Sequence, residues 1–116
     1  MSLAVKRVYE PPADGDGQRV LVDRLWPRGL SKDAAKVDLW LKEVAPSTGL
    51  RKWFGHDPAK WEEFRRRYFA ELDAAAEAIE SLRRLAKGRR VTLVHGARDT
   101  EHNDAVALLE YLRRSS

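Results

Sequence analysis

Short runs of β-branched and aliphatic residues predict the strands of this chain. Residues Val5–Tyr9 alternate between apolar and polar positions and predict a short strand at the edge of a sheet. The runs Val20–Val22 and Val91–Val94 carry apolar or β-branched residues in succession, which is typical of buried strands. The segment Val37–Val44 has apolar residues at spacings that fit either a helix or a strand, so its pattern leaves both open.

A long amphipathic helix is predicted near residues 58–87. Asp57 followed by Pro58 favours a helix start, because aspartate caps free amides and proline fits the first helical position. Apolar residues then recur in steps of three and four, at Trp61, Phe64, Tyr68, Leu72, Ala75, Ile79, Leu82 and Ala86. Gly88 ends the pattern. A straight helix of this length would span about 45 Å, so we expect a bend or break near Asp73–Ala76.

Three shorter helices complete the prediction. Ser31 can cap a short helix over Lys32–Lys36, a turn or two is predicted at Leu50–Phe54, and the last helix covers Ala105–Arg114. Ser47 suits a turn or a cap before the second of these helices. Strands that alternate with helices predict one α/β domain over residues 1–116, with a small sheet of about three strands that is at least partly parallel.

Length and composition limit the classes of protein to consider. The chain has 116 residues, which fits one compact domain, and its net charge of +4 mildly favours anionic partners. It has no cysteine, which excludes disulfides, thiolate metal sites and a cysteine nucleophile. No apolar stretch approaches the roughly 20 residues that span a bilayer. We therefore expect a cytoplasmic protein that does not span the membrane. The sequence specifies neither a cofactor nor an oligomeric state.

Several sequence blocks resemble the YeaO-like family of bacterial proteins, which is catalogued as a domain of unknown function. The resemblance rests on residues 6–9, on residues 16–29 with their Arg-Leu-Trp-Pro-Arg-Gly block, and on residues 46–54 in the middle of the chain. It continues through the spacing of Phe64 and Tyr68 and through residues between Thr92 and Ala105, so it covers nearly the whole chain. The resemblance implies a small α/β fold and no particular reaction, and whether the protein is an enzyme stays open.

Two positions depart from the pattern of that family. A tyrosine is typical of YeaO-like proteins where this chain has His95, and a histidine where this chain has Asp104. A mechanism that needs a histidine at the second position is therefore not carried over to this chain.

Polar sequence follows two of the predicted strands at the point where each ends. In open α/β sheets, ligands bind beyond the carboxyl ends of parallel strands. If the strands at Val20–Val22 and Val91–Val94 are parallel neighbours, their following residues converge on one rim, with Asp23, Arg24, Arg28, His95, Arg98, Asp99 and Asn103 as the candidate site. The short connection over residues 10–18 instead favours an antiparallel or non-adjacent placement of the first strand relative to the second.

Recognition of a small anion is the chemistry that this rim favours. Arg28 and Arg98 offer forked donors that match phosphate or carboxylate, and the last helix directs its free amides to the same region. Asp23 is the candidate acid or base, and Asn103 would orient the ligand. The predicted ligand is phosphate-bearing or nucleotide-like. In the alternative interpretation Asp23 pairs with a neighbouring arginine, while Trp26 and Pro27 fill the core.

The sequence gives weaker support for a metal site or for a catalytic nucleophile. The spacing of His95, Asp99, His102 and Asp104 matches no recognised ligand pattern, so we expect no metal site. His56 precedes a helix cap and is interpreted as structural or exposed. Ser47 lies far from any evident base, which argues against a nucleophile.

Two further functions stay open at this point. Arg65–Arg67, interleaved with Trp61, Phe64 and Tyr68, fit a nucleic-acid-binding module, although glutamates at helical spacing also fit a solvated face. A non-catalytic interaction protein would expose an apolar patch around Trp40, Trp53 and Phe54.

Overall fold

A parallel sheet forms the centre of the computed structural model, which describes residues 1–114. The described residues form four strands in the order β1-β4-β2-β3, and each pairing is parallel. The strands are β1 (Leu3–Arg7), β2 (Gln18–Leu21), β3 (Leu39–Trp40) and β4 (Val91–His95). The sheet thus has one strand more than the three expected, because the ambiguous segment 37–44 contributes the short β3. The first strand lies at the edge and is not adjacent to the second, as expected.

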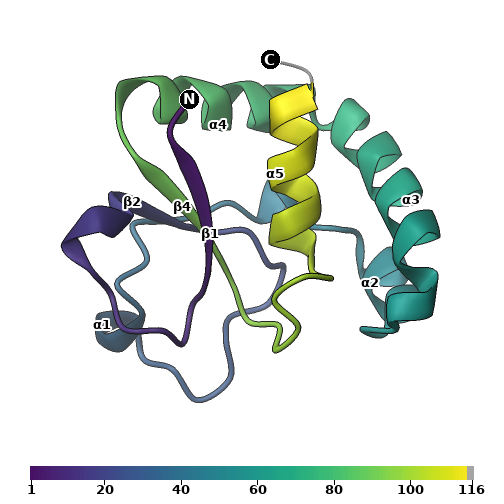
Figure 1. Cartoon of the computed structure of the whole chain (residues 1–116), viewed down its shortest axis with the longest axis horizontal. Coiled ribbons are helices and arrows are strands. Elements are labelled where there is room, and N and C mark those ends of the chain that lie inside the picture. Colours follow the sequence, from purple (N-terminus) through teal and green to yellow (C-terminus); the bar gives the residue numbers. More distant parts are fainter. Residues whose placement is uncertain (115–116) are drawn as a thin grey trace.

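Helices follow the strands in alternation and confirm the α/β class (Figure 1). Their bounds are α1 (Lys32–Ala35), α2 (Thr48–Phe54), α3 (Trp61–Ala74), α4 (Ala76–Gly88) and α5 (Asp104–Arg114), with 3₁₀ turns η1 (Asp14–Asp16), η2 (Lys42–Val44) and η3 (Pro58–Lys60). None of these helices, within residues 1–114, is long and apolar enough to cross a membrane.

Alternate residues of the two central strands enter two separate apolar clusters. Val20 and Leu93 join the larger cluster, which contains the buried residues of α3, α4 and α5. Leu21 and Val94 point to the opposite face and pack with Ala35 of α1. Because side chains of a strand alternate between its faces, continuously apolar central strands require cover on both sides.

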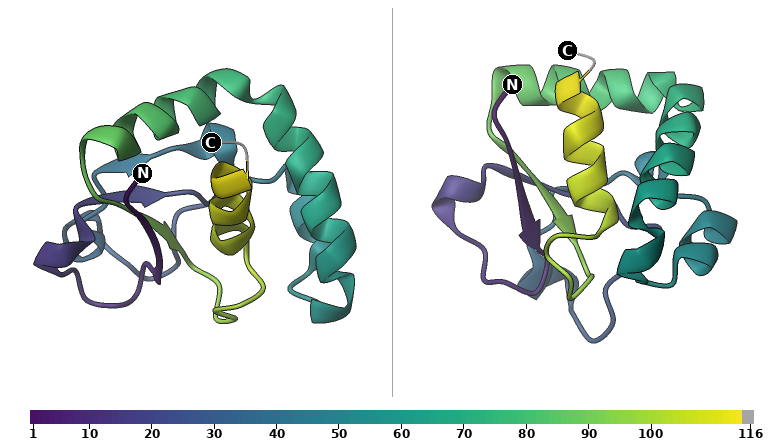
Figure 2. Two further views of the ribbon diagram at one scale, coloured as in Figure 1. Left: turned by 45° about the horizontal axis from the view of Figure 1, so that its top comes forward. Right: turned by 45° about the vertical axis from the view of Figure 1, so that its right-hand side comes forward.

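The predicted long helix is broken at Ala75, within the expected interval. Ala75 has φ −105° and ψ 39°, outside the helical region, and it separates α3 from α4. Figure 2 shows the two helices meeting at a sharp bend over the sheet. The break lets Tyr68 and Leu82, one from each helix, reach the same core.

Side-chain caps fix where the shorter helices begin. Ser31 Oγ accepts a hydrogen bond from the Ala34 amide at 3.1 Å, and Ser47 Oγ accepts one from Leu50 at 3.2 Å. Asp57 caps as expected, but its carboxylate begins the 3₁₀ turn η3, and the α-helix itself starts three residues later at Trp61.

The parallel strands bring the loops after β1, β2 and β4 to one edge of the molecule. This edge lies opposite α4 and the start of β1 (Figure 1). The amino end of α5 and the helix α2 border the same edge, so five segments that are distant in sequence surround one space.

Candidate functional site

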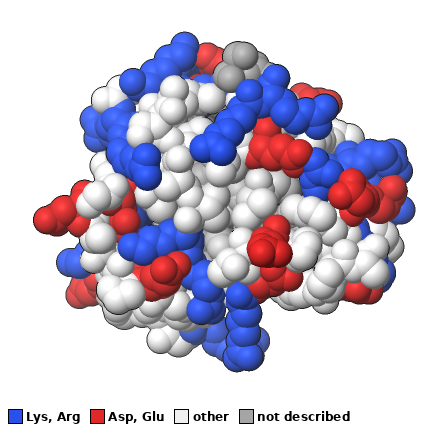
Figure 3. Space-filling view, viewed as in Figure 1, with Lys and Arg blue, Asp and Glu red and all other residues white. Residues whose placement is uncertain are grey.

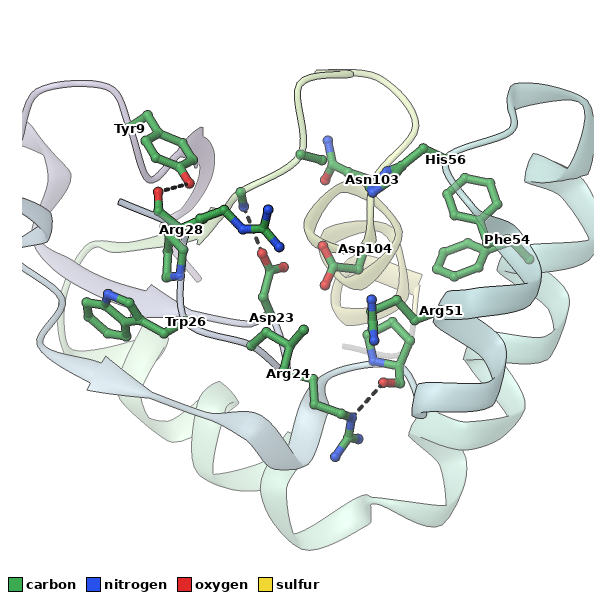
Figure 4. A pocket seen from close by; sticks show the side chains of 16 residues that line it. Tyr9, Asp23, Arg24, Trp26, Arg28, Arg51, Phe54, His56, Asn103 and Asp104 are labelled. Carbon is green, nitrogen blue, oxygen red and sulfur yellow. Dashed lines mark hydrogen bonds between the residues drawn. The ribbon is translucent and has the colours of Figure 1, made fainter. Parts of the chain in front are cut away.

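A cavity of about 340 Å³ lies at the carboxyl ends of the strands (Figure 4). Its walls come from the loops after β1, β2 and β4, from α2 and the residues beside it, from the amino end of α5, and from Phe64 of α3. The charged and polar residues on this wall that matter most are Asp23, Arg24, Arg28, Arg51, Asn103 and Asp104.

Asp23 is held in place from two sides. Its carboxylate oxygen Oδ2 accepts a hydrogen bond of 2.7 Å from the backbone N–H of Gly96, which follows β4. Its backbone carbonyl accepts a hydrogen bond of 2.7 Å from Nε1 of Trp40 on β3. The carboxylate therefore joins the ends of two neighbouring strands.

Asp104 faces Asp23 across the cavity wall (Figure 4). It is the first residue of α5, and its Oδ1 accepts a hydrogen bond from the Ala105 amide at 2.9 Å. Burial raises the pKa of Asp104 well above its ordinary value, and the charge of Asp23 and a hydrogen bond between the two carboxyls raise that pKa further. Two close carboxyls are most stable when they share one proton. The pair therefore holds a proton at pH values where an isolated aspartate is ionised.

Three arginines reach the cavity, but only two are available to a ligand. Arg24 donates to the backbone carbonyls of Pro46 at 3.0 Å and Ala45 at 3.3 Å, so its guanidinium serves the loop before α2. Arg28 and Arg51 are exposed on the wall, and neither forms an ion pair with another of the residues 1–114. The loop that carries Arg28 is fastened by a 2.8 Å hydrogen bond from the Tyr9 hydroxyl to the Arg28 carbonyl.

The structure brings only some of the predicted site residues to the cavity. Asp23, Arg24, Arg28 and Asn103 line it. Asn103 also caps α5, because its Oδ1 accepts a 2.9 Å hydrogen bond from the Val106 amide.

The remaining predicted residues do not line the cavity. His95 and Asp99 form hydrogen bonds with residues near them in sequence, and Arg98 is exposed to solvent. His95 is 1% exposed, and its Nδ1 accepts a hydrogen bond from the Ala97 amide at 3.1 Å. Burial lowers the pKa of His95, although Asp23 raises it somewhat, so the ring is neutral near pH 7. Asp99 accepts hydrogen bonds from two backbone amides in its own turn and contacts His102. Arg98 is exposed and does not reach the cavity.

Among the residues of the wall that sequence reasoning did not assign to the site are two charged residues, Arg51 and Asp104, and the histidine His56. Arg51 lies one helical turn after the Ser47 cap, and its place within the family block of residues 46–54 was the available signal. His56 adopts a left-handed conformation with φ 57°, directly after Gly55 with φ 52°. Such backbone conformations are costly for residues other than glycine and are concentrated at functional sites.

Two other expectations change with the tertiary structure. Arg65 of α3 pairs with Glu62 and Glu110, and Arg66 and Arg67 both pair with Glu63, so the three arginines are neutralised along the helix. Of the three aromatic residues in the alternative of an exposed apolar patch, Phe54 is 5% exposed and stacks on Phe64, while Trp40 and Trp53 are half-buried.

Metal ligands are not grouped in the described part of the chain. Residues 1–114 contain no cluster of three or more His, Asp or Glu side chains arranged to hold a metal ion. The carboxyl pair of Asp23 and Asp104 is therefore better considered with the arginines around it.

Comparison with known proteins places this chain in a family. A family model described as the inactive DUF488-N3 subclade matches residues 2–116. The chain belongs to the DUF488-N3i family. The matched residues include every residue that lines the cavity, among them those of the loops after β2 and β4.

Relatives of this DUF488-N3i protein occur in distant bacteria. It is 42% identical over 113 residues to the uncharacterized protein YeaO of Escherichia coli, with 97% of this chain and 98% of the relative covered. It is 45% identical over 108 residues to the uncharacterized protein Rv3073c of Mycobacterium tuberculosis, with 93% and 91% covered. These matches confirm the resemblance to YeaO-like proteins. No solved structure matches the chain significantly.

Proposed function

We propose that this DUF488-N3i protein binds a small phosphate-bearing or carboxylate-bearing molecule in the cavity at the carboxyl ends of its strands. The observation that carries the proposal is the position of Arg28 and Arg51, which line a cavity of about 340 Å³ without an ion-pair partner among residues 1–114. Guanidinium groups match the geometry of phosphate and carboxylate oxygens and form strong charge-assisted hydrogen bonds with them.

The rest of the wall suits a compact organic ligand. Trp26 and Phe54 contribute apolar surface, while Arg28 and Arg51 lie at separate places on the wall (Figure 4). Cavities that combine an apolar wall with a few convergent polar groups are the usual form of small-molecule sites. A nucleotide-like molecule or a sugar phosphate has this combination of a flat or ring-shaped body and an anionic end.

Binding without turnover is the form of the proposal that the comparisons favour. The matching family is described as inactive, and no motif in the chain specifies a cofactor. Asp23 remains the candidate acid or base of the site, but its carboxylate already accepts the Gly96 amide and faces Asp104. We therefore assign Asp23 a part in holding the ligand.

Thermal shift against a panel of inorganic phosphate, nucleotides, sugar phosphates and short oligonucleotides tests this function. A ligand at about 100 times its Kd stabilises the folded chain by about 2.7 kcal/mol, which is a shift of a few degrees for a domain of this size. Arg28→Ala and Arg51→Ala should each weaken binding roughly 10-fold or more, since a hydrogen bond to a charged group contributes about 1.5–3 kcal/mol.

Arg98→Ala is the matched control, because Arg98 follows β4 near the same edge but does not line the cavity. This variant should bind as the unaltered protein does. Equal losses in all three variants would contradict the cavity as the site. A shift given only by oligonucleotides, and lost steeply with added salt, would favour the nucleic-acid-binding alternative. The absence of any shift across the panel would overturn the proposed function.

A further inference from the structure

The wall of the cavity carries both signs of charge, and the two signs are not paired with each other. The carboxyls of Asp23 and Asp104 lie side by side, with Arg28 and Arg51 on the same wall (Figure 4). Neither carboxyl has an arginine, lysine or histidine within ion-pair distance among residues 1–114. Elsewhere in the chain close opposite charges do pair, as Asp16 does with Arg19 at 2.7 Å.

No other group on the wall neutralises the carboxyl pair. The guanidinium of Arg24, the nearest basic residue in sequence, is committed to two backbone carbonyls. Gly96 and Ala105 donate backbone N–H groups to the two carboxyls, and these groups carry no formal charge. His56 lines the cavity from the segment after α2 and has no ion pair within the described residues. Once an anion occupies Arg28 or Arg51, the carboxyl pair is left as an uncompensated negative charge.

This arrangement is poorly suited to a ligand that is only anionic. A carboxyl pair beside the anion repels it, and the repulsion is strong in a partly enclosed space where water screens charges weakly. A ligand that also carries a positive group satisfies both parts of the wall. Such a group would replace the proton that two adjacent carboxyls otherwise share. When positive and negative groups of a site match those of a ligand, the match increases specificity for that ligand more than it increases affinity.

Because the wall carries charges of both signs, we infer that the ligand is a small zwitterion, whose anionic group lies on Arg28 or on Arg51 and whose protonated amine lies between Asp23 and Asp104. This inference rests on the proposed anion-binding function and adds the second half of the ligand. It predicts that the site prefers an amine over a hydroxyl at one defined distance from the anion.

Three matched pairs of commercial compounds test the preference, because the members of each pair differ by one amine in place of one hydroxyl. They are glucosamine 6-phosphate with glucose 6-phosphate, phosphoethanolamine with 2-hydroxyethyl phosphate, and O-phosphoserine with 3-phosphoglycerate. Isothermal titration calorimetry on the full chain measures both affinity and proton release, the latter by repeating each titration in buffers of different ionisation enthalpy. In at least one pair the amine should bind 10-fold tighter and release more protons than its hydroxyl partner, since both phosphates titrate alike and only the amine displaces the carboxyl proton.

Asp104→Asn is the decisive variant, since it keeps the shape of the side chain and removes one carboxyl. It should reduce the amine preference to less than about threefold and abolish the difference in proton release within the pair, while affinity for the hydroxyl compound is kept or improved. Asp23→Asn gives a second, independent test of the same pair. Glu101→Gln, an exposed acidic residue outside the wall, is the control and should leave the preference intact.

The possible failures of the two proposals differ. Equal binding of both members of every pair, with affinity lost in Arg28→Ala, would overturn the zwitterion and keep the anion site. An amine preference that survives in both Asp104→Asn and Asp23→Asn would also overturn the inference. Binding of no compound in the set, or binding unaffected by Arg28→Ala and Arg51→Ala, would overturn the proposed function together with the inference.

Discussion

Asp16 and Arg19 form an ion pair that is buried beside the start of β2. Arg19 is 2% exposed and Asp16 8% exposed, and the two are joined at 2.7 Å. Arg19 also donates to the carbonyls of Ala35 and Val8, so one side chain links α1, β2 and the end of β1. Burial alone would raise the pKa of Asp16, but hydrogen bonds from the Ala13 amide, Arg19 and Lys6 lower it below its ordinary value.

Asp16→Ala should therefore destabilise the protein strongly. The substitution leaves Arg19 buried without its carboxylate, and breaking a buried pair in this way costs about 3–5 kcal/mol. Because the folded pKa is depressed, this stabilisation is present above the unfolded value of 3.8 and is lost as pH falls through the folded pKa. Urea denaturation at pH 7 measures the change. Asp14→Asn, in the same turn but exposed, should change stability by less than about 0.5 kcal/mol.

Asp104 has the opposite pH dependence. Its folded pKa is raised by burial and by Asp23, so the stability that it contributes is full below the unfolded value of 3.8 and is lost as pH rises through the folded pKa. Asp104→Asn should increase the free energy of unfolding at pH 8, by about 1 kcal/mol, and change it less at pH 4. Denaturation of both proteins across this range measures the difference, and a constant difference at all pH values would contradict the assignment.

The join between η1 and β2 depends on one glycine. Gly17 has φ 64°, in the left-handed region, and a Cβ built there would lie 2.2 Å from the backbone oxygen of Arg90. That same oxygen accepts the Gln18 amide at 2.9 Å, which begins the pairing of β2 with β4. The backbone of the two strands can approach this closely only because position 17 has no side chain.

Gly17→Ala should cost more than the roughly 1–2 kcal/mol of left-handed backbone strain, because the clash also moves the loop before β4. Thermal denaturation measures it. Gly15→Ala is the matched control two residues earlier, where an added Cβ meets nothing within 4 Å. Equal losses in the two variants would show that the close approach is not the cause.

At the scale of the whole molecule, basic residues are distributed away from the proposed site as well as within it. Figure 3 shows lysine and arginine along the upper edge of the molecule, over α4 and the end of α5. Exposed members of this basic edge are Arg84, Lys87, Arg89, Arg90 and Arg114. A net charge of +4 with such a distribution favours weak, non-specific contact with polyanions.

Weak binding to DNA is therefore expected, and it should be independent of the cavity. Its affinity should fall steeply with salt, because contacts to phosphates release bound counterions. Arg28→Ala should leave this binding nearly unchanged, whereas Arg89→Ala combined with Arg90→Ala should reduce it. Fluorescence anisotropy with a labelled duplex at 50 and 200 mM salt measures both effects. A tight, salt-resistant complex would instead indicate a dedicated nucleic-acid site.

The sequence by itself determined most of the elements and their order, and β3 is an exception because the pattern of residues 37–44 fitted a helix as well as a strand. The β-branched runs predicted β2 and β4, the steps of three and four predicted α3 and α4, and Ser31 and Asp57 marked helix starts. These features are local, since the period of an apolar pattern and a cap depend on neighbours within a few residues. The short connection before β2 favoured either an antiparallel or a non-adjacent placement of β1, because a parallel crossover needs a longer segment. The structure shows the second of these, with β4 between β1 and β2.

The composition of the site was decided by the tertiary structure. Asp23 and Arg28 could be predicted because they directly follow a strand, and the carboxyl ends of parallel strands share one edge. His95 ends β4 and Arg98 lies in the loop after it, but their side chains do not reach the wall. A position in sequence does not fix the direction in which a loop residue points.

Asp104 and Arg51 are the opposite case, since they line the cavity although no pattern in the sequence assigned them to it. They reach the cavity only because α5 packs against the sheet and α2 packs against α3, so that both helices border the same space as the loop after β2. The meeting of Asp104 with Asp23 joins residues that are 81 positions apart. Such a contact depends on how the amphipathic helices bury their apolar faces on the sheet, and no pattern within a single segment records it.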